Sequence, residues 1–143
     1  MKVDAVLETK GREVKTIGPS ATLATVAQRL RLKRIGALVV LDDDKMIGMI
    51  SERDVVHAFA ADRLRSADVK VADVMTRQVI SCLPDDGLTR VLALMTRHRV
   101  RHVPVVRAGE LLGLISIGDV VKHRLDELEM EAAVLRDSYF VSH

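Results

Sequence analysis

The sequence predicts an α+β fold made of two copies of one unit, each with the order strand, helix, strand, strand, helix. The prediction depends first on a repeat: residues 48–56, GMISERDVV, return as residues 113–121, GLISIGDVV. The match extends upstream without a gap at the same offset of 65 residues, at which Asp54 corresponds to Asp119. Because internal repeats determine the architecture of a chain, we interpret the sequence as a duplication of one βαββα unit.

The first unit begins with a short helix and a short strand. Apolar spacing at residues 3–9 indicates one or two helical turns, and alternation over residues 13–17 indicates a strand. Residues 21–34 have apolar side chains three and four positions apart, which predicts a helix. Either Thr22 or Ser20 is suited to cap its N-terminus.

A hairpin and a second helix complete this unit. Two apolar runs of strand length, residues 37–41 and 46–50, flank the polar residues 42–45. This connection is too short for a parallel crossover, so the two strands are predicted to be antiparallel. A helix from residue 52 to about residue 64 follows, and residues 62–70 form a polar connection to the second unit.

The second unit repeats this order and ends in a longer helix. Its predicted elements are a short helix at 71–75, a strand at 78–81, a helix at 88–98, hairpin strands at 101–106 and 111–115, and a helix from about 118 to 140. The last helix carries apolar residues spaced by four and three, namely Val121, Leu125, Leu128, Ala132 and Leu135. This stripe packs on its own domain or forms a homodimer seam. We favour the homodimer, because a lone domain would leave the stripe in water.

Composition excludes several classes of protein. The 143 residues are 48% apolar, enough for one domain with a substantial core. A net charge of +2 and an aromatic content of 2% argue against a nucleic-acid partner. The single cysteine, Cys82, fits a reducing compartment. No apolar run reaches membrane-spanning length and the N-terminus lacks a secretion signal, so we expect a cytoplasmic protein without a membrane partner.

Three short motifs resemble one known family. The repeated pattern Gly-h-h-Ser-x-x-Asp-h-h (h apolar) is joined by DVMT at residues 73–76 and RHVPV at residues 101–105. Together with the element order, these motifs resemble a pair of cystathionine-β-synthase (CBS) domains. The resemblance implies two repeats, residues 1–64 and 65–143, around a pseudo-two-fold axis. It also implies two clefts between the repeats, where many relatives bind AMP, ATP, NAD or S-adenosylmethionine.

The Ser and Asp of the repeated motif have a local explanation. Ser51 and Asp54 nearly form a capping box, and Ser116 and Asp119 repeat it. Two departures favour a ligand. Arg53 lies in a first helical turn, where the helix dipole disfavours a cation, and a bound anion would resolve that conflict. Its counterpart Gly118 would let a ligand approach the backbone closely.

The predicted nucleotide sites combine these residues with others from the family pattern. Asp54 and Asp119 would accept hydrogen bonds from ribose hydroxyls, Ser51 and Ser116 would contact ribose or phosphate, and Arg53 would pair with phosphate. By the family pattern, adenine would lie among Thr16, Ile17 and Ala37 in one cleft, and among Ile80, Cys82 and Val103 in the other. Arg101 and His102 begin a strand and are suited to reach a second phosphate, whereas we assign Arg97 and Arg99 to an exposed helix end. We therefore predict two unlike nucleotide sites.

These observations favour a regulatory sensor over an enzyme. No residue is predicted to be catalytic, and the five histidines lack the spacing of metal ligands. The expected ligands are AMP, NAD, NADH or ATP, with no catalytic cofactor and an unknown protein effector. The alternative is a dimerising interaction scaffold whose clefts are vestigial. Nucleotide binding distinguishes the two hypotheses.

Overall fold

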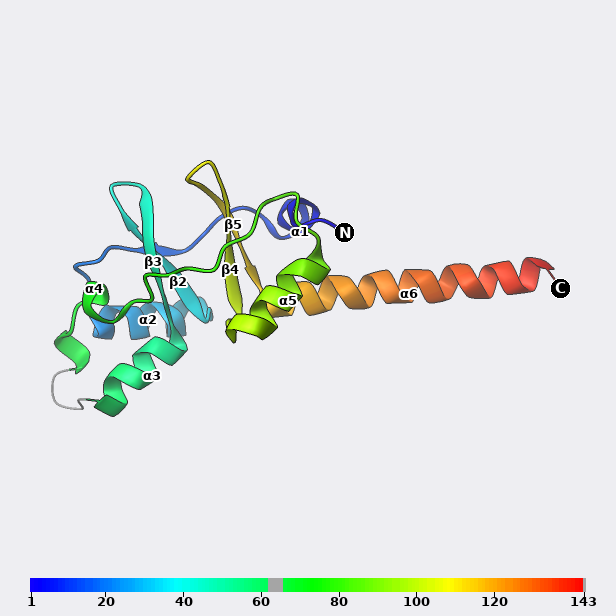
Figure 1. The fold of residues 1–143 in the computed structure, drawn as a ribbon. Coiled ribbons are helices and arrows are strands. Elements are labelled where there is room, and N and C mark those ends of the chain that lie inside the picture. Colours follow the sequence, from blue (N-terminus) through cyan, green and yellow to red (C-terminus); the bar gives the residue numbers. More distant parts are fainter. Residues whose placement is uncertain (62–65, 143) are drawn as a thin grey trace.

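The structure, a computed structural model, describes residues 1–61 and 66–142. It consists of two similar halves, each built on a β-hairpin (Figure 1). The first half contains β1 (Thr16–Ile17), α2 (Leu23–Lys33), β2 (Ala37–Asp42), β3 (Lys45–Ser51), α3 (Glu52–Ala61), a 3₁₀ turn (Ser66–Asp68) and α4 (Val71–Val74). The predicted end of the helix near residue 64 lies outside the described residues.

The second half repeats this order with a longer final helix. It contains α5 (Leu88–His98), β4 (His102–Arg107), β5 (Glu110–Ser116) and α6 (Ile117–Ser142), and the chain begins with α1 (Val3–Lys10). The two hairpins have equivalent registers, since Ala37 pairs with Ser51 and His102 pairs with Ser116. The predicted α+β fold of two similar repeats is confirmed.

One predicted strand is wrong. Residues 78–81 form no strand, and their half keeps only a parallel bridge between Cys82 and Val105. In the first half, the Val39 N–H donates to the Lys15 carbonyl (3.2 Å) and extends the pairing of β1 with β2. The residue equivalent to Val39 is Pro104, which has no N–H to donate. The ladder therefore shortens to a single bridge.

Each hydrophobic core includes a short helix that lies far away in sequence. Val3, Val6 and Leu7 of α1 are buried in the core of the second half, together with Leu88 and other residues of that half. The backbone joins them as well: the Val3 N–H donates to the Asp86 carbonyl (2.9 Å). In Figure 1, α1 accordingly lies beside β5.

The first half receives α4 in the corresponding place. Val71 and Met75 are buried in its core, and the Val71 N–H donates to the Ala21 carbonyl (2.8 Å). The predicted division between the repeats, at residues 64 and 65, lies outside the described residues. Helix α1 precedes this division but packs in the second half, and α4 follows it but packs in the first half.

Two equivalent glycines permit these helices to approach the strands closely. A Cβ on Gly48 would lie 2.8 Å from both the Met75 sulfur and the Thr76 carbonyl oxygen, and a Cβ on Gly113 would lie 2.6 Å from Leu7 Cδ2. Real Cβ contacts are not this short, so Gly48 is required next to the Thr76 backbone, and a side chain at Gly113 would require the buried Leu7 side chain to shift. The approach at Gly48 also brings Thr76 next to the end of β3.

Helix α6 extends well beyond the body of the molecule (Figure 1). The predicted apolar stripe is exposed along it, with Val121 at 48%, Leu125 at 55%, Leu128 at 47% and Leu135 at 71%. The stripe is therefore not covered by its own domain. Among the described helices, none combines the length and the apolar content needed to cross a membrane.

Candidate functional site

Each hairpin ends in a corner formed by a Ser and an Asp at the start of a helix. At the first corner, the Ser51 N–H donates to Asp54 Oδ2 (2.8 Å) and the Asp54 N–H donates to Ser51 Oγ (3.4 Å). These reciprocal bonds cap α3 as a capping box does, with Asp in place of Glu or Gln. The other carboxylate oxygen, Oδ1, accepts a long bond from the Thr76 hydroxyl (3.3 Å). The local explanation for the motif is thus present, and it uses mainly one oxygen of Asp54.

A cavity of about 1080 Å³ lies beside this corner, between the two halves. Ligand pockets typically measure about 300–1,000 Å³, so this cavity is large enough for a nucleotide. One part of its wall is apolar and comprises Ala37, Met49, Val79, Ile80, Met95, Val100 and Ile117. Another part is polar and includes Ser51, Glu52, Arg53, Asp54, Thr76, Gln78, Arg99 and Arg101.

Cations outnumber acids in this wall. Arg53 lies in the first turn of α3, as predicted, and its Nη1 donates a long bond to the Arg99 carbonyl (3.5 Å). Arg99 ends α5 with a left-handed backbone (φ 55°), a conformation that costs about 1–2 kcal/mol for a non-glycine residue. With Arg101, these residues supply three guanidinium groups against the carboxylates of Glu52 and Asp54. The cavity is therefore suited to an anionic ligand that also has an apolar part.

His102 separates this cavity from a second one. Its ring lies against the backbone of Gly36, where a Cβ would be 2.8 Å from the ring, and it lines both cavities. Burial lowers the pKa of His102 and the positive charge of Lys10 lowers it further, whereas Glu52 and Asp119 act in the opposite direction. The net effect keeps the imidazole neutral near pH 7.

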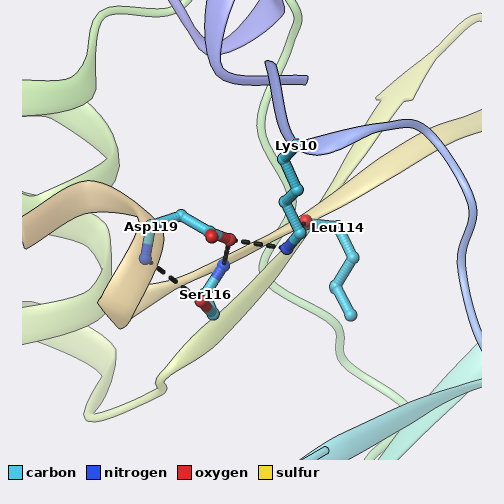
Figure 2. Close-up of polar contacts among 4 residues, drawn as sticks. All are labelled: Lys10, Leu114, Ser116 and Asp119. Carbon is cyan, nitrogen blue, oxygen red and sulfur yellow. Dashed lines mark hydrogen bonds and ion pairs between the residues drawn. The ribbon is translucent and has the colours of Figure 1, made fainter. Parts of the chain in front are cut away.

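The second corner has the same reciprocal bonds and, in addition, a cation. The Ser116 N–H donates to Asp119 Oδ2 (2.8 Å) and the Asp119 N–H donates to Ser116 Oγ (3.2 Å). Lys10, at the end of α1, places its Nζ 2.5 Å from Asp119 Oδ2 and 2.7 Å from the Leu114 carbonyl oxygen (Figure 2). The adjacent cavity measures only about 310 Å³.

The contacts of Asp119 determine its ionisation. Burial raises its pKa, but the hydrogen bonds from Lys10 and from the Ser116 N–H outweigh burial, so the pKa lies below its ordinary value. Asp119 is therefore an ionised carboxylate that already has a cationic partner.

The structure brings most of the predicted site residues together. Those that line the larger cavity are Ala37, Ser51, Arg53, Asp54, Ile80, Arg101, His102 and Ser116. Thr16, Gly118 and Asp119 do not belong to the described lining of either cavity.

Three residues predicted to contact adenine lie in the hydrophobic cores and not in the cavities. Ile17 and Cys82 are each 4% exposed, Val103 is fully buried, and all three pack in the hydrophobic cores. Successive side chains of a strand point to opposite faces, so only alternate residues of β1 and β4 are able to face a cleft. These three residues face inward.

Sequence reasoning missed several residues of the cavity. Thr76, Gln78 and Val79 line it because the chain crosses between the halves after α4. Arg99, assigned to an exposed helix end, also lines it, since the left-handed backbone turns the chain into the cleft region. The available signal was proximity to the motifs, because Thr76 ends the DVMT motif, Gln78 and Val79 follow it, and Arg99 lies just before the RHVPV motif.

The fold is that of a tandem-repeat module with two cavities between its halves. A model of the CBS domain matches residues 8–61 and 71–126, and the chain belongs to the CBS-domain family. Pairs of CBS domains are generally regulatory modules.

Three similar proteins illustrate the relationship. The CBS-domain protein ATU1752 from Agrobacterium tumefaciens is 41% identical, with a TM-score of 0.84 over 87% of this chain and 99% of that chain. An uncharacterized 17.7 kDa protein of Acidianus ambivalens is 33% identical over 91% of this chain and 77% of its own length. The CBS domain pair of protein MJ0100, solved in complex with 5′-methylthioadenosine and S-adenosyl-L-methionine, shares the fold at 22% identity, with a TM-score of 0.79 over 89% of this chain and 98% of that chain.

Proposed function

We propose that this CBS pair is a sensor that binds an adenine nucleotide in the Asp54 cavity. The supporting observation is that one cavity of about 1080 Å³ is lined by two acidic residues, three arginines and an apolar wall drawn from both halves. A nucleotide has the complementary groups, namely a ribose diol, phosphates and an aromatic base. The complex of MJ0100 with adenosine compounds supports the same ligand class for this fold.

The proposed contacts follow from the geometry of the corner. Asp54 Oδ1 would accept a ribose hydroxyl in place of its long bond to Thr76, while Oδ2 continues to cap α3. Arg53, Arg99 and Arg101 would bind phosphate oxygens, and the helix dipole of α3 would add to their effect. The base would pack on Val79 and Ile80. AMP, ATP, NAD and NADH all satisfy this pattern.

The test is binding of these four nucleotides to the purified protein. Native mass spectrometry identifies any nucleotide carried through purification, and isothermal titration calorimetry then measures each dissociation constant. We expect at least one of the four to bind in the micromolar range, where cellular concentrations would populate the site. If none binds at millimolar concentration, the scaffold hypothesis, in which the clefts are vestigial, replaces this proposal.

We also propose that the exposed stripe of α6 joins two copies of the chain. Large apolar side chains that remain in water along a projecting helix are typical of an interaction surface, and a matching helix from a second copy would cover them. Nucleotide binding between the halves would then alter the position of one subunit relative to the other. An effector protein would respond to this change in the relative position of the two subunits.

The stripe predicts how the mass of the protein in solution changes on substitution. The wild-type protein should sediment at twice the chain mass of 15.8 kDa. Replacing Leu125 by Glu places a charge in the centre of the seam and should produce the monomer mass. The matched control is Leu32→Glu, at a residue that is 79% exposed on α2. A wild-type protein that sediments as a monomer at micromolar concentration would contradict the proposed seam.

A further inference from the structure

The two cavities are equivalent by the repeat but differ threefold in volume. Nearly every described residue of the smaller cavity has its 65-residue counterpart in the larger one. The pairs include Val14 with Val79, Arg34 with Arg99, Ile35 with Val100, Leu114 with Met49, and Ser116 with Ser51. By the repeat, the smaller cavity is therefore the counterpart of the Asp54 cavity.

Lys10 is the exception to this correspondence. Its counterpart is Met75, which is 8% exposed, packs against Gly48 in the first core and lines neither cavity. Lys10 lines the smaller cavity and places its amine on Asp119 and on the Leu114 carbonyl (Figure 2). At one position of the repeat, an apolar core residue is thus replaced by a cation in the cleft.

The consequence for Asp119 is that its carboxylate already has a cationic partner, bound at the oxygen Oδ2 that also caps α6. Asp119 Oδ2 accepts both the Ser116 N–H and the Lys10 amine, whereas the equivalent Asp54 has no cation on its carboxylate among its described contacts. The Lys10 amine lies within 2.5 Å of the carboxylate that a ribose would need. A nucleotide in this cleft would meet the Lys10 amine beside the carboxylate, in a cavity of only about 310 Å³.

We infer that Lys10 acts as an internal ligand of Asp119 and restricts the chain to one nucleotide, bound at Asp54. This inference rests on the proposed function, and it replaces the two unlike sites predicted from sequence with one open cleft and one occupied cleft. It also assigns to α1 a role in ligand stoichiometry, although α1 lies at the opposite end of the chain from Asp119.

The test is the number of nucleotides bound per chain, measured by calorimetry with AMP and ATP. The wild-type protein should bind one. Lys10→Met, which installs the residue type of the other repeat, should bind two, and Lys10→Met combined with Asp54→Ala should again bind one. The matched control is Lys15→Met, which removes a charge from the same cavity without touching Asp119 and should leave one site. Two sites in the wild-type protein, or no gain of a site in Lys10→Met relative to the wild-type protein, would overturn the inference.

A second measurement separates this inference from the proposed function. Carbon-13 NMR titration of the carboxylates should show a higher pKa for Asp119 in Lys10→Met than in the wild-type protein, because burial then acts without the Lys10 hydrogen bond. Lys15→Met should leave that pKa unchanged. If the wild-type protein binds nothing but Lys10→Met binds one nucleotide, the proposed Asp54 site is wrong and the role of Lys10 stands. If neither protein binds a nucleotide, both proposals fail.

Discussion

Replacing Asp54 by Ala should weaken nucleotide binding about 100-fold. The Asp54 carboxylate would accept the ribose hydroxyls, and hydrogen bonds to a charged group contribute roughly 1.5–3 kcal/mol each. A loss of about 3 kcal/mol corresponds to a factor of about 100 in the dissociation constant. The measurement is the dissociation constant of the nucleotide that binds the wild-type protein most tightly.

Asp54 also caps α3, so the loss of binding must be separated from a loss of structure. Asp54→Asn retains an oxygen that accepts from the Ser51 N–H, and it should keep the stability of the fold while still losing most of the affinity. Asp42→Ala, at an exposed carboxylate at the end of β2, is the control and should bind like wild type. An affinity that is unchanged in Asp54→Asn and Asp54→Ala would mean that the carboxylate does not contact the ligand.

Replacing Leu7 by Ala should lower the free energy of unfolding by about 2–5 kcal/mol, the usual cost of removing a large side chain from a core. Leu7 belongs to the N-terminal helix, yet it is fully buried in the second half and its Cδ atoms lie against Gly113. Urea denaturation monitored by circular dichroism measures the change, at a fixed protein concentration because a dimer would add to the apparent stability.

The control for this substitution is Leu32→Ala, which removes the same atoms from a side chain that is 79% exposed and should change stability by less than about 0.5 kcal/mol. If Leu7→Ala were equally mild, α1 would not be part of the second core. The packing of α1 would then not hold Lys10 in position beside Asp119.

The repeat predicted the fold because the hydrophobic pattern, the turns and the motif agreed in both copies. Hairpin positions were predicted to within about one residue, since apolar runs of strand length bounded by polar turns have few alternative structures. The predicted strand at residues 78–81 does not form because Pro104 has no N–H to donate to it. Pro104 was visible in the sequence, but it lies in the neighbouring strand β4, so local reasoning about residues 78–81 did not reveal the missing hydrogen bond.

The candidate site was predictable only in part, for a physical reason. Asp54, Arg53 and Arg101 are identified by local rules, such as a cation in a first helical turn. Lys10 is not, because no local pattern indicates that α1 crosses to the other half and ends beside Asp119. Ile17 and Val103 show the converse case: they lie in the predicted strands, but their side chains face the hydrophobic cores and not the cavity.

The packing of α1 on the second half has a consequence for synthesis. Helix α1 is synthesised before its packing partners: Asp86 and Leu88 follow about 80 residues later in the chain, and β5 follows later still. At about 5–20 residues per second, Val3, Val6 and Leu7 stay unburied for roughly 6–23 s, until α5, β4 and β5 have been synthesised. During this interval the nascent chain presents an apolar surface to chaperones. The contact between Lys10 and Asp119 forms only after the second half has been synthesised.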